Sequence, residues 1–405
     1  MTAASSGRRA HSPVFIVGAG PVGLVAAIRL REQGIHVRIV DELTAETKRT
    51  YPAVLHAPTL RVLNSLGVTA PLEWRGRPVA RLALYADGQR RSVLDMPAAG
   101  ELSPTTMTLP QDVLRQALTT RLHELGTEVE WKTRLVALDQ DANRARLGIV
   151  RREQVEGMSP SLKPEWLDVA AETVDADFVI GADGCRSAVR QKLGIEWVSM
   201  GRRQLYAFFD APDYRAGDEA HLVFAGGTAN SVYPLQSNYS RFTFQVGVAM
   251  LEAPAAPQLR QLLESRMPWY AAQTHDFEWS GSAEFHPALA DRFGEGRVWL
   301  AGDAAHSTGP LGAQSVNVGI HEADELARRI VQRVHNIEAS PLGPAYGERR
   351  RLEWQHLFGL ESSKPWSPST PDWVKRNLAM LLPSLPAAGD DLRELLQRLH
   401  VELAA

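Results

Sequence analysis

VFIVGAGPVG, residues 14–23 of a chain of 405, places three glycines in the pattern Gly-x-Gly-x-x-Gly directly after a β-branched run. AAIRLREQG (26–34) follows with the spacing of an amphipathic helix that ends in glycine, and HVRIVDE (36–42) has the composition of a second strand. Strand, tight turn, helix and strand in this order form a βαβ unit. The opening of the chain therefore predicts a Rossmann-like domain that binds a dinucleotide.

Each glycine of this turn has a separate function in a dinucleotide site. Gly18 permits the tight turn, Gly20 lets a pyrophosphate approach the backbone without meeting a Cβ, and Gly23 lets the helix pack closely on the strand. The helix begins at Pro21 and Val22, where free N–H groups and the helix dipole favour a phosphate. A purely structural glycine turn is the alternative, and the helix and strands around it argue against that interpretation.

Two acidic residues end the second strand. Asp41 lies 18 residues after Gly23 and is followed by Glu42. A carboxylate at this place can accept hydrogen bonds from the ribose hydroxyls of a dinucleotide. The fingerprint occurs once in the chain, which predicts one firmly held dinucleotide and leaves any second one without a Rossmann domain of its own.

The composition is that of a globular protein and excludes several classes. The net charge is −3, so the chain lacks the basic footprint of a nucleic-acid binder. The single cysteine, Cys185, cannot form an internal disulfide and offers no metal-ligand pattern, which fits a reducing, cytoplasmic location. The first 13 residues lack the apolar stretch of a secretory signal, and no run of about 20 apolar residues predicts a membrane span.

The texture of the chain changes along its length. Strand-like segments separated by turns fill 196–289 and indicate a mainly antiparallel sheet. The chain is therefore expected to have an α/β fold, with a Rossmann-like domain, an inserted β-sheet domain that binds the substrate, and a short helical C-terminal region. The expected boundaries are a disordered tail, 1–12; the dinucleotide domain, 13–75, 105–195 and 290–350; the sheet domain, 76–104 and 196–289; and the C-terminal region, 351–405.

Four further segments carry a resemblance to one family. ADFVIGADGCRSAVRQKLGI (176–195) resembles an Asp-Gly motif, and LAGDAAHSTGPLGAQSVNVGI (300–320) resembles a Gly-Asp motif. PQDVLRQAL (110–118) and AYGERR (345–350) resemble two shorter segments of the same family. With the glycine turn, they have the order and spacing found in FAD-dependent aromatic hydroxylases, the para-hydroxybenzoate-hydroxylase-like single-component monooxygenases.

The resemblance implies that the resident dinucleotide is FAD and that no metal is bound. In the family, the Asp-Gly motif serves both FAD and NAD(P)H. The positions that the resemblance assigns to cofactor binding are Gly18, Gly20, Pro21, Val22, Gly23, Asp41, Glu42, Gln111, Asp183, Gly302, Asp303, Pro310, Gly312, Ala313, Ser315, Val316 and Asn317.

The physical chemistry of the Gly-Asp segment agrees with this assignment. Asp303 follows the apolar run VWLAG and is expected at the carboxyl end of a strand, where open α/β sheets bind ligands; an N-cap for the next helix is the alternative. GPLG (309–312) fits a close turn against a flat ring. The helix expected to open at Gln314 would face the negative charge of a reduced flavin.

The chemistry implied by the resemblance is oxygen insertion. NAD(P)H would reduce FAD, O₂ would add at flavin C4a, and the hydroperoxide would oxygenate an aromatic or polyketide- or alkaloid-type small molecule. Because the cofactor carries this chemistry, no dense catalytic cluster is expected. The candidates for a catalytic side chain are His221, Tyr233 and His286, with Tyr206 and Gln245 as further candidates for substrate contacts.

Other functions remain open in the sequence. An FAD oxidoreductase that oxidises or rearranges its substrate without inserting oxygen would need the same cofactor residues. A flavin-binding protein without turnover is a third possibility. A flavin-dependent halogenase would need a Trp-x-Trp-x-Ile-Pro stretch, which the chain lacks. A monomer or a homodimer is expected.

The chain departs from the family pattern at several sites. Ala313 stands where many relatives have a second glycine, and Ser315 stands where many have glycine. Tyr51, with Arg49 nearby, occupies the segment in which the family places an arginine near the flavin. Asp41 replaces the more frequent Glu.

Overall fold

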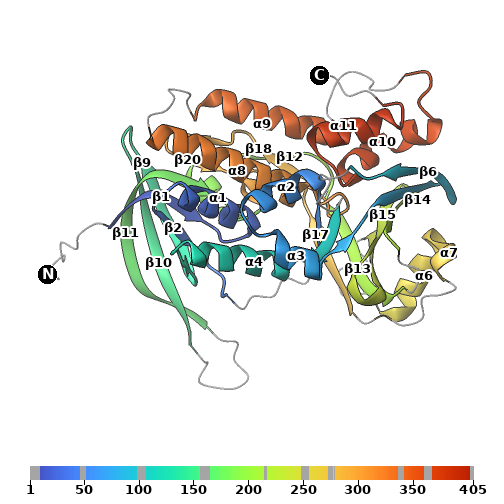
Figure 1. The fold of residues 1–405 in the computed structure, drawn as a ribbon, viewed down its shortest axis with the longest axis horizontal. Helices are drawn as coiled ribbons and strands as arrows, with labels where there is room; N and C mark the ends of the chain where they lie inside the picture. The colour runs from blue at the N-terminus through green and yellow to red at the C-terminus, as the bar shows by residue number, and fades with distance from the viewer. Residues whose placement is uncertain are drawn as a thin grey trace.

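The computed structural model describes residues 10–45, 52–97, 106–155, 165–213, 217–247, 255–271, 277, 279–335, 342–359 and 367–401. Tyr51 and Arg49 lie outside these residues, as does most of the expected N-terminal tail. Figure 1 shows a helix-covered sheet at one end of the molecule and a second sheet at the other, with the C-terminal helices above their junction. The predicted α/β class is confirmed; the exact domain boundaries stay a prediction.

The first sheet is Rossmann-like. Its strand order is β19-β20-β11-β1-β2-β8, and all neighbouring pairs except β19–β20 are parallel. The strands of this path are β1 (Ala10–Val17), β2 (Val37–Val40), β8 (Val129–Glu130), β11 (Glu165–Gly181), β19 (Gly294–Glu295) and β20 (Val298–Leu300). Two further strands, β9 (Thr133–Gln140) and β10 (Ala145–Val155), branch from this path: β10 pairs antiparallel with β11, and β9 pairs antiparallel with β10.

Helices cover this sheet because their apolar faces match its buried strands. Helix α1 (Pro21–Glu32) packs against both α4 (Gln111–Glu124) and α8 (Gln314–Val334). The shorter helices of this part are α2 (Ala57–Ser65), α3 (Thr69–Arg75) and α5 (Ala188–Lys192). A small sheet, in the order β3-β7-β4, consists of β3 (Pro52–Leu55), β7 (Met107–Pro110) and β4 (Arg77–Pro78).

The turn from β1 into α1 depends on two close backbone approaches. Gly18 has φ +103°, and a Cβ on it would lie 2.2 Å from the carbonyl oxygen of Ala182 in the neighbouring strand exit. A Cβ on Gly23 would lie 2.0 Å from the carbonyl oxygen of Gly18. Only glycine fits at these two positions, which matches the purposes predicted for them.

The second sheet has the order β17-β13-β16-β15-β14-β5-β6 and is antiparallel except at β14–β5. Its strands are β5 (Arg81–Ala86), β6 (Gln89–Asp95), β13 (Gln204–Pro212), β14 (Glu219–Ala225), β15 (Thr228–Pro234), β16 (Tyr239–Val246) and β17 (Trp279–Phe285). One face packs toward the Rossmann-like part. The other is covered by α6 (Ala256–Arg266) and α7 (Pro268–Ala271), which the strand-like texture of this region did not predict.

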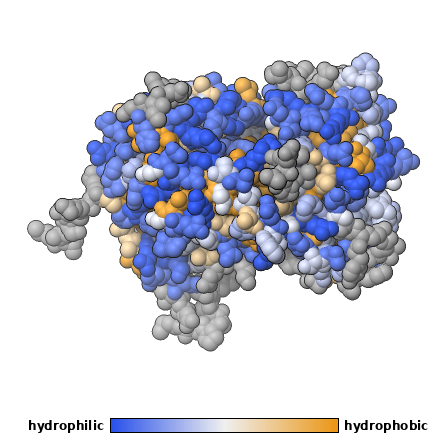
Figure 2. All heavy atoms as spheres, in the orientation of Figure 1, coloured by the Kyte–Doolittle hydropathy of each residue, from blue (hydrophilic) through white to orange (hydrophobic). Residues whose placement is uncertain are grey.

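A third sheet, β12-β18-β21, links the two parts, and its strands are β12 (Trp197–Ser199), β18 (Ala288–Ala290) and β21 (His306–Ser307). The C-terminal helices are α9 (Pro344–Leu357), α10 (Asp372–Ser384) and α11 (Gly389–Gln397). Figure 2 shows a mostly hydrophilic face with apolar residues in small groups. Within the described ranges, no helix has the length and apolar character needed to cross a membrane.

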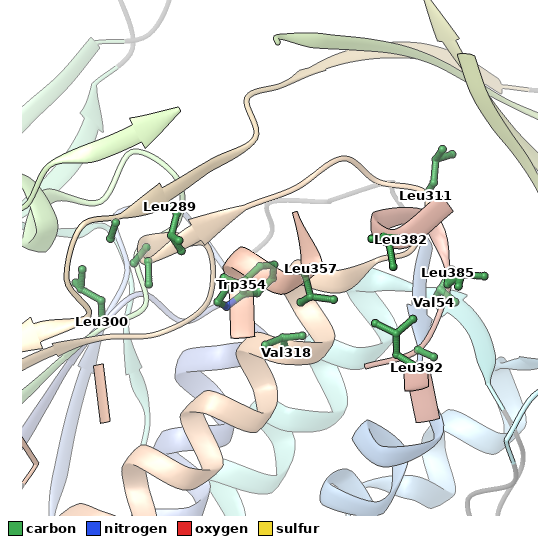
Figure 3. Close-up of a cluster of buried hydrophobic side chains, with 14 of the residues drawn as sticks. Val54, Leu289, Leu300, Leu311, Val318, Trp354, Leu357, Leu382, Leu385 and Leu392 are labelled. Atoms are coloured by element: carbon green, nitrogen blue, oxygen red, sulfur yellow. The ribbon is translucent and has the colours of Figure 1, made fainter. Parts of the chain in front are cut away.

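The C-terminal region packs directly on the loop between β21 and α8. Leu382, Leu385 and Leu392 come close to Leu311 and Val54 in one buried apolar cluster (Figure 3). The side-chain amide of Gln314 donates to the carbonyl oxygens of Leu385 (2.6 Å) and Ala387 (2.8 Å). These contacts fix the loop from the side of the C-terminal helices.

His56, which precedes α2, fixes the same loop from the opposite side. Its Nε2–H donates to the carbonyl oxygen of Gly312 (2.8 Å), and its backbone N–H donates to Oδ1 of Asn317 (2.8 Å). Burial lowers the pKa of His56 from 6.5 to about 3, so the ring stays neutral in the folded protein.

This lowered pKa predicts a pH-dependent stability. Between about pH 6.5 and about pH 3, His56 is protonated in the unfolded chain and neutral in the folded chain. The free energy of unfolding therefore decreases as the pH is lowered through this range. Replacing the ring with a neutral side chain, His56→Gln, should remove about 2 kcal/mol of the stability loss between about pH 7 and about pH 5. Urea unfolding at both pH values measures this difference. His321, whose pKa burial lowers to about 4, remains in the variant and gives a residual slope. An identical loss in both proteins would contradict the assignment.

Candidate functional site

A groove of about 360 Å³ lies where β1, β2 and β11 end. This is the edge at which open α/β sheets bind ligands. It brings together residues from distant parts of the sequence. Of the positions predicted to bind the cofactor, those that line it are Gly18, Gly20, Pro21, Val22, Asp41, Glu42, Gln111, Asp183, Asp303 and Val316.

The start of α1 forms the part of the groove suited to a pyrophosphate. Gly20 is the N-cap residue, and no side chain caps the helix. A Cβ on Gly20 would meet no atom within 4 Å, so the backbone here faces open space in the groove. An uncapped helix start with unobstructed access fits the phosphates of FAD.

Asp41 directly follows β2, as predicted, and it both stabilises the glycine turn and lines the groove. Its Oδ2 accepts from the backbone N–H of Ala19 (2.7 Å), and its Oδ1 accepts from that of Leu43 (2.8 Å). Each carboxylate oxygen can accept a further hydrogen bond. Asp41 therefore braces the glycine turn and still faces the groove, where it can receive ribose hydroxyls. The side chain of neighbouring Glu42 is mostly exposed.

The groove has an aromatic neighbour that the sequence did not single out. Trp131 follows β8 and lines a small hollow beyond Asp41, together with Gln111 and Arg115. The guanidinium of Arg115 lies 5.7 Å from the centroid of the indole ring. A flat ring at the sugar end of a dinucleotide groove suits a purine. In the sequence, only the position of Trp131 directly after β8, the strand next to β2, could have indicated that it lies beside the groove.

Asp183 lines the groove, but its oxygens already hold the Asp-Gly turn. It accepts from Ser187 Oγ (2.5 Å) and from the backbone N–H groups of Ala188 (2.7 Å) and Val189 (3.2 Å). Burial raises the pKa of Asp183 above its ordinary value, and these hydrogen bonds oppose that rise. Its observed contacts are those of a cap for α5.

The two arginines of this motif differ. Arg186 is exposed and lines the groove. Arg190 is buried and donates to the carbonyl oxygens of Ala304 (2.8 Å) and Cys185 (2.7 Å). Its guanidinium also lies 3.9 Å from the ring centroid of Trp197. Arg190 therefore joins the Asp-Gly and Gly-Asp segments and is neither a solvated surface residue nor a groove residue.

Glu322 on α8 organises the Gly-Asp segment from behind. Its Oε2 accepts from the backbone N–H of Gly302 (3.0 Å) and lies 2.8 Å from Nε2 of His306; its Oε1 accepts from Nε1 of Trp354 (2.9 Å). The rings of His306 and Trp354 are stacked, with centroids 3.7 Å apart. Burial alone would raise the pKa of Glu322, but these neighbours bring it below its ordinary value. The network holds the turn that directs Asp303 into the groove.

The start of α8 shows how the departures from the family pattern are accommodated. Ala313 is the N-cap residue and has φ +50°, a left-handed conformation that glycine adopts more easily. The hydroxyl of Ser315 accepts from the backbone N–H of Thr308 (3.2 Å), so it closes the turn before the helix. No side chain caps α8, and Val316 in its first turn lines the groove.

Other predicted positions serve the loop rather than the groove. Asn317 is buried, and its Nδ2 donates to the carbonyl oxygens of Val54 (2.7 Å) and Ala313 (2.8 Å). A Cβ on Gly312 would lie 2.4 Å from the carbonyl oxygen of Pro383, so Gly312 allows contact with the C-terminal region. The remaining predicted positions that do not line the groove are Gly23, Gly302, Pro310, Ala313 and Ser315.

A second cavity, of about 120 Å³, lies on the other side of the loop. Thr308, Gly309 and Leu311 form its wall on the loop side. Strands β13 and β16 contribute Gln204, Tyr206 and Gln245, and α10 contributes four residues at its C-terminal half. The loop therefore has the groove near one end and a cavity of mixed polar and apolar lining beside it. Tyr206 and Gln245, two predicted substrate contacts, lie in this cavity.

The three predicted catalytic residues do not lie in this cavity. His221 packs against Tyr85 and Tyr270, on the sheet face covered by α6 and α7. His286 follows β17 with an exposed side chain near Glu284. Tyr233 is buried, and its hydroxyl donates to the carbonyl oxygen of Leu311 (3.2 Å). His221 and His286 therefore lie away from this cavity, and Tyr233 contacts the loop beside it; a catalytic role for any of the three stays a prediction. Within the described part of the chain, no group of three or more His, Cys, Asp or Glu could hold a metal ion.

Two curated relatives have the same level of identity. Pentachlorophenol 4-monooxygenase of Sphingobium chlorophenolicum is 26% identical over 368 residues, which are 88% of this chain and 65% of that protein. 6-Methylpretetramide 4-monooxygenase of Streptomyces rimosus is 26% identical over 347 residues, which are 83% of this chain and 58% of that protein. The chain therefore spans 58–65% of the length of these two relatives.

The fold and the family agree with each other. The crystal structure of p-nitrophenol 4-monooxygenase from Pseudomonas putida superposes with a TM-score of 0.72 at 21% identity, over 96% of this chain and 97% of that chain, which shows a shared fold. A sequence profile described as an FAD binding domain matches residues 11–357. Since this match extends from β1 to the end of α9 and covers most of the protein, the chain belongs to the FAD-binding-domain family.

Proposed function

We propose that this protein is an FAD-dependent monooxygenase, which uses NAD(P)H and O₂ to hydroxylate an aromatic small molecule. The observation that carries the proposal is the pair of hollows beside one loop. The groove at the strand ends reaches Asp303 and Val316, which flank the loop in the sequence, and the second cavity meets the loop itself at Thr308 and Gly309. Such a loop can present a flat ring to a substrate held by the second sheet.

The residues of the groove fit FAD part by part. The open helix start at Gly20 would hold the pyrophosphate, and Asp41 would accept from the ribose of the adenosine half. Asp303, exposed in the groove, would accept from the hydroxyls of the ribityl chain. The uncapped start of α8 offers N–H groups and a helix dipole to an electron-rich ring edge. FAD, when bound, supplies electron transfer from NAD(P)H and the activation of O₂.

The work left for the protein is orientation and the exclusion of water. The buried network of Glu322 holds the turn before the loop, and the contacts of His56, Gln314 and Tyr233 hold the loop itself. The apolar side chains of the cavity, which include Leu311, Phe358 and Met380, would pack against a substrate ring and reduce its contact with bulk solvent. The names of the curated relatives, which act on pentachlorophenol and 6-methylpretetramide, support a phenolic substrate for this chain as well.

Isotope labelling tests the reaction class. Purified protein with FAD, NAD(P)H and a panel of phenols is expected to consume NAD(P)H faster when a substrate is present. Under oxygen-18 gas, one heavy oxygen atom should appear in the product, as detected by mass spectrometry. An oxidised product without the label would instead show an FAD oxidoreductase that inserts no oxygen. A yellow protein that oxidises no NAD(P)H with any phenol of the panel would show flavin binding without turnover.

Gly20→Val tests the position of the pyrophosphate. Gly20 has φ −70° and open space around its Cβ position, so valine should be tolerated by the fold. Its side chain would fill the space in front of the helix start and weaken FAD binding by at least about 100-fold. Flavin absorbance of the purified protein and titration with FAD measure the effect, and thermal melting without FAD checks the fold.

Gly217→Val is the matched control. Gly217 is exposed, and a Cβ on it would likewise meet no atom within 4 Å, but it lies outside the groove. The control should bind FAD as the unaltered protein does. If Gly20→Val contains as much FAD as the unaltered protein, the pyrophosphate does not bind at this helix start.

A further inference from the structure

The wall between the cavity and the loop contains a hydrogen-bonded pair. The hydroxyl of Tyr206 donates to Oε1 of Gln204 (3.0 Å), and both residues line the cavity from β13. The two residues are separated by one position, so they point to the same face of the sheet. Tyr206 is almost fully buried, and burial raises the pKa of its hydroxyl, which keeps it protonated.

The pair still has one donor and one acceptor to offer. With the Tyr206 hydroxyl donating to Gln204, the amide Nε2–H₂ of Gln204 remains a donor and the Tyr206 oxygen remains an acceptor. If the amide were turned over, Gln204 Oε1 would be the remaining acceptor and the Tyr206 hydroxyl the remaining donor. In both arrangements, the combination complements a hydroxyl group, which donates one hydrogen bond and accepts another.

The pair lies against the loop that separates the two hollows. A Cβ on Gly309 would lie 2.7 Å from Oε1 of Gln204 and 3.2 Å from the Tyr206 hydroxyl oxygen. Glycine at this position therefore lets the two polar groups approach the loop backbone next to Pro310. A ligand hydroxyl held by this pair would lie beside the loop, at the end of the cavity nearest the proposed cofactor.

The rest of the cavity favours an uncharged ring. Its described lining includes Met200, Leu311, Phe358 and Met380 and contains no Asp, Glu, Lys, Arg or His. Thioether and aromatic side chains pack well against aromatic rings. A carboxylate or an ammonium group would lose its hydration here without gaining a counter-ion from this lining.

We propose that the cavity binds a neutral aromatic compound that carries a hydroxyl group, and that Gln204 and Tyr206 together recognise this hydroxyl. The assignment of the ligand as a substrate rests on the proposed function; the binding itself does not. The cavity therefore selects against aromatic acids and against phenols whose hydroxyl is blocked.

Isothermal titration calorimetry of the purified protein with three matched probes tests this proposal. The probes are 4-methylphenol, its methyl ether and 4-hydroxybenzoate. The phenol should bind about 10-fold more tightly than the ether, because the ether cannot donate, and about 100-fold more tightly than the carboxylate. Tyr206→Phe and Gln204→Leu should each weaken binding of the phenol about 3- to 10-fold and weaken binding of the ether less, because the ether can only accept a hydrogen bond from the pair.

Tyr85→Phe is the control for the loss of a tyrosine hydroxyl. Tyr85 belongs to the same sheet but packs against Trp269 on the face covered by α6 and α7. It should leave the binding of all three probes unchanged. If Tyr206→Phe does not fold, Gln204→Leu, which alters a less buried residue, still tests the pair.

The outcomes separate this inference from the proposed function. Tight binding of 4-hydroxybenzoate, equal weakening of phenol and ether in both variants, or no binding of the phenol to FAD-loaded protein would overturn the inference. Binding of the phenol that depends on Tyr206 and Gln204, without incorporation of oxygen-18, would support the inference and overturn the proposed monooxygenase.

Discussion

The buried carboxylate of Glu322 is the interaction on which the site depends. A charge without solvent is stable only when donors surround it, and here these come from Gly302, His306 and Trp354. These donors belong to the turn after β20, to β21 and to α9, and Glu322 itself lies on α8. Satisfying one carboxylate therefore fixes four segments relative to one another. The groove side of the Gly-Asp turn is positioned by Glu322, His306 and Trp354, none of which lines the groove.

The loop from Thr308 to Ala313 is held in the same indirect way. His56 holds it from the side of α2, Gln314 attaches it to the backbone after α10, and the Tyr233 hydroxyl reaches it from the second sheet. The contacts of His56 and Tyr233 use carbonyl oxygens of the loop itself, so they specify the conformation of its backbone more than the identity of its side chains. This explains how Ala313 can keep a left-handed conformation where glycine would adopt it more easily.

The sequence predicted those features of the site that depend on short stretches of the chain, such as tight turns and the residues that follow strands. The glycine turn, Asp41 at the end of β2 and Asp303 after β20 follow from strand ends and tight turns, and the structure places all of them along one groove. The faces of the second sheet could not be predicted. Alternation along β14 places His221 opposite to Leu222, but which face turns toward the Rossmann-like part depends on α6 and α7. Gln204 was missed for the same reason, because nothing in QLYAFFD (204–210) indicates which residues meet the loop.

The helix starts that border the groove differ in whether side chains already satisfy their N–H groups. The first turns of α1 and α8 have no side-chain cap, and Gly20 and Val316 at these starts line the groove. The first turn of α5 is capped by Ser187 and braced by Asp183, so its N–H groups are already satisfied. Unsatisfied N–H groups require water or a ligand as a partner. Where the open starts of α1 and α8 line the groove, an anionic cofactor would find unsatisfied N–H groups. The capped start of α5 explains why Asp183, although it lines the groove, contributes to the shape of the site more than to its charge.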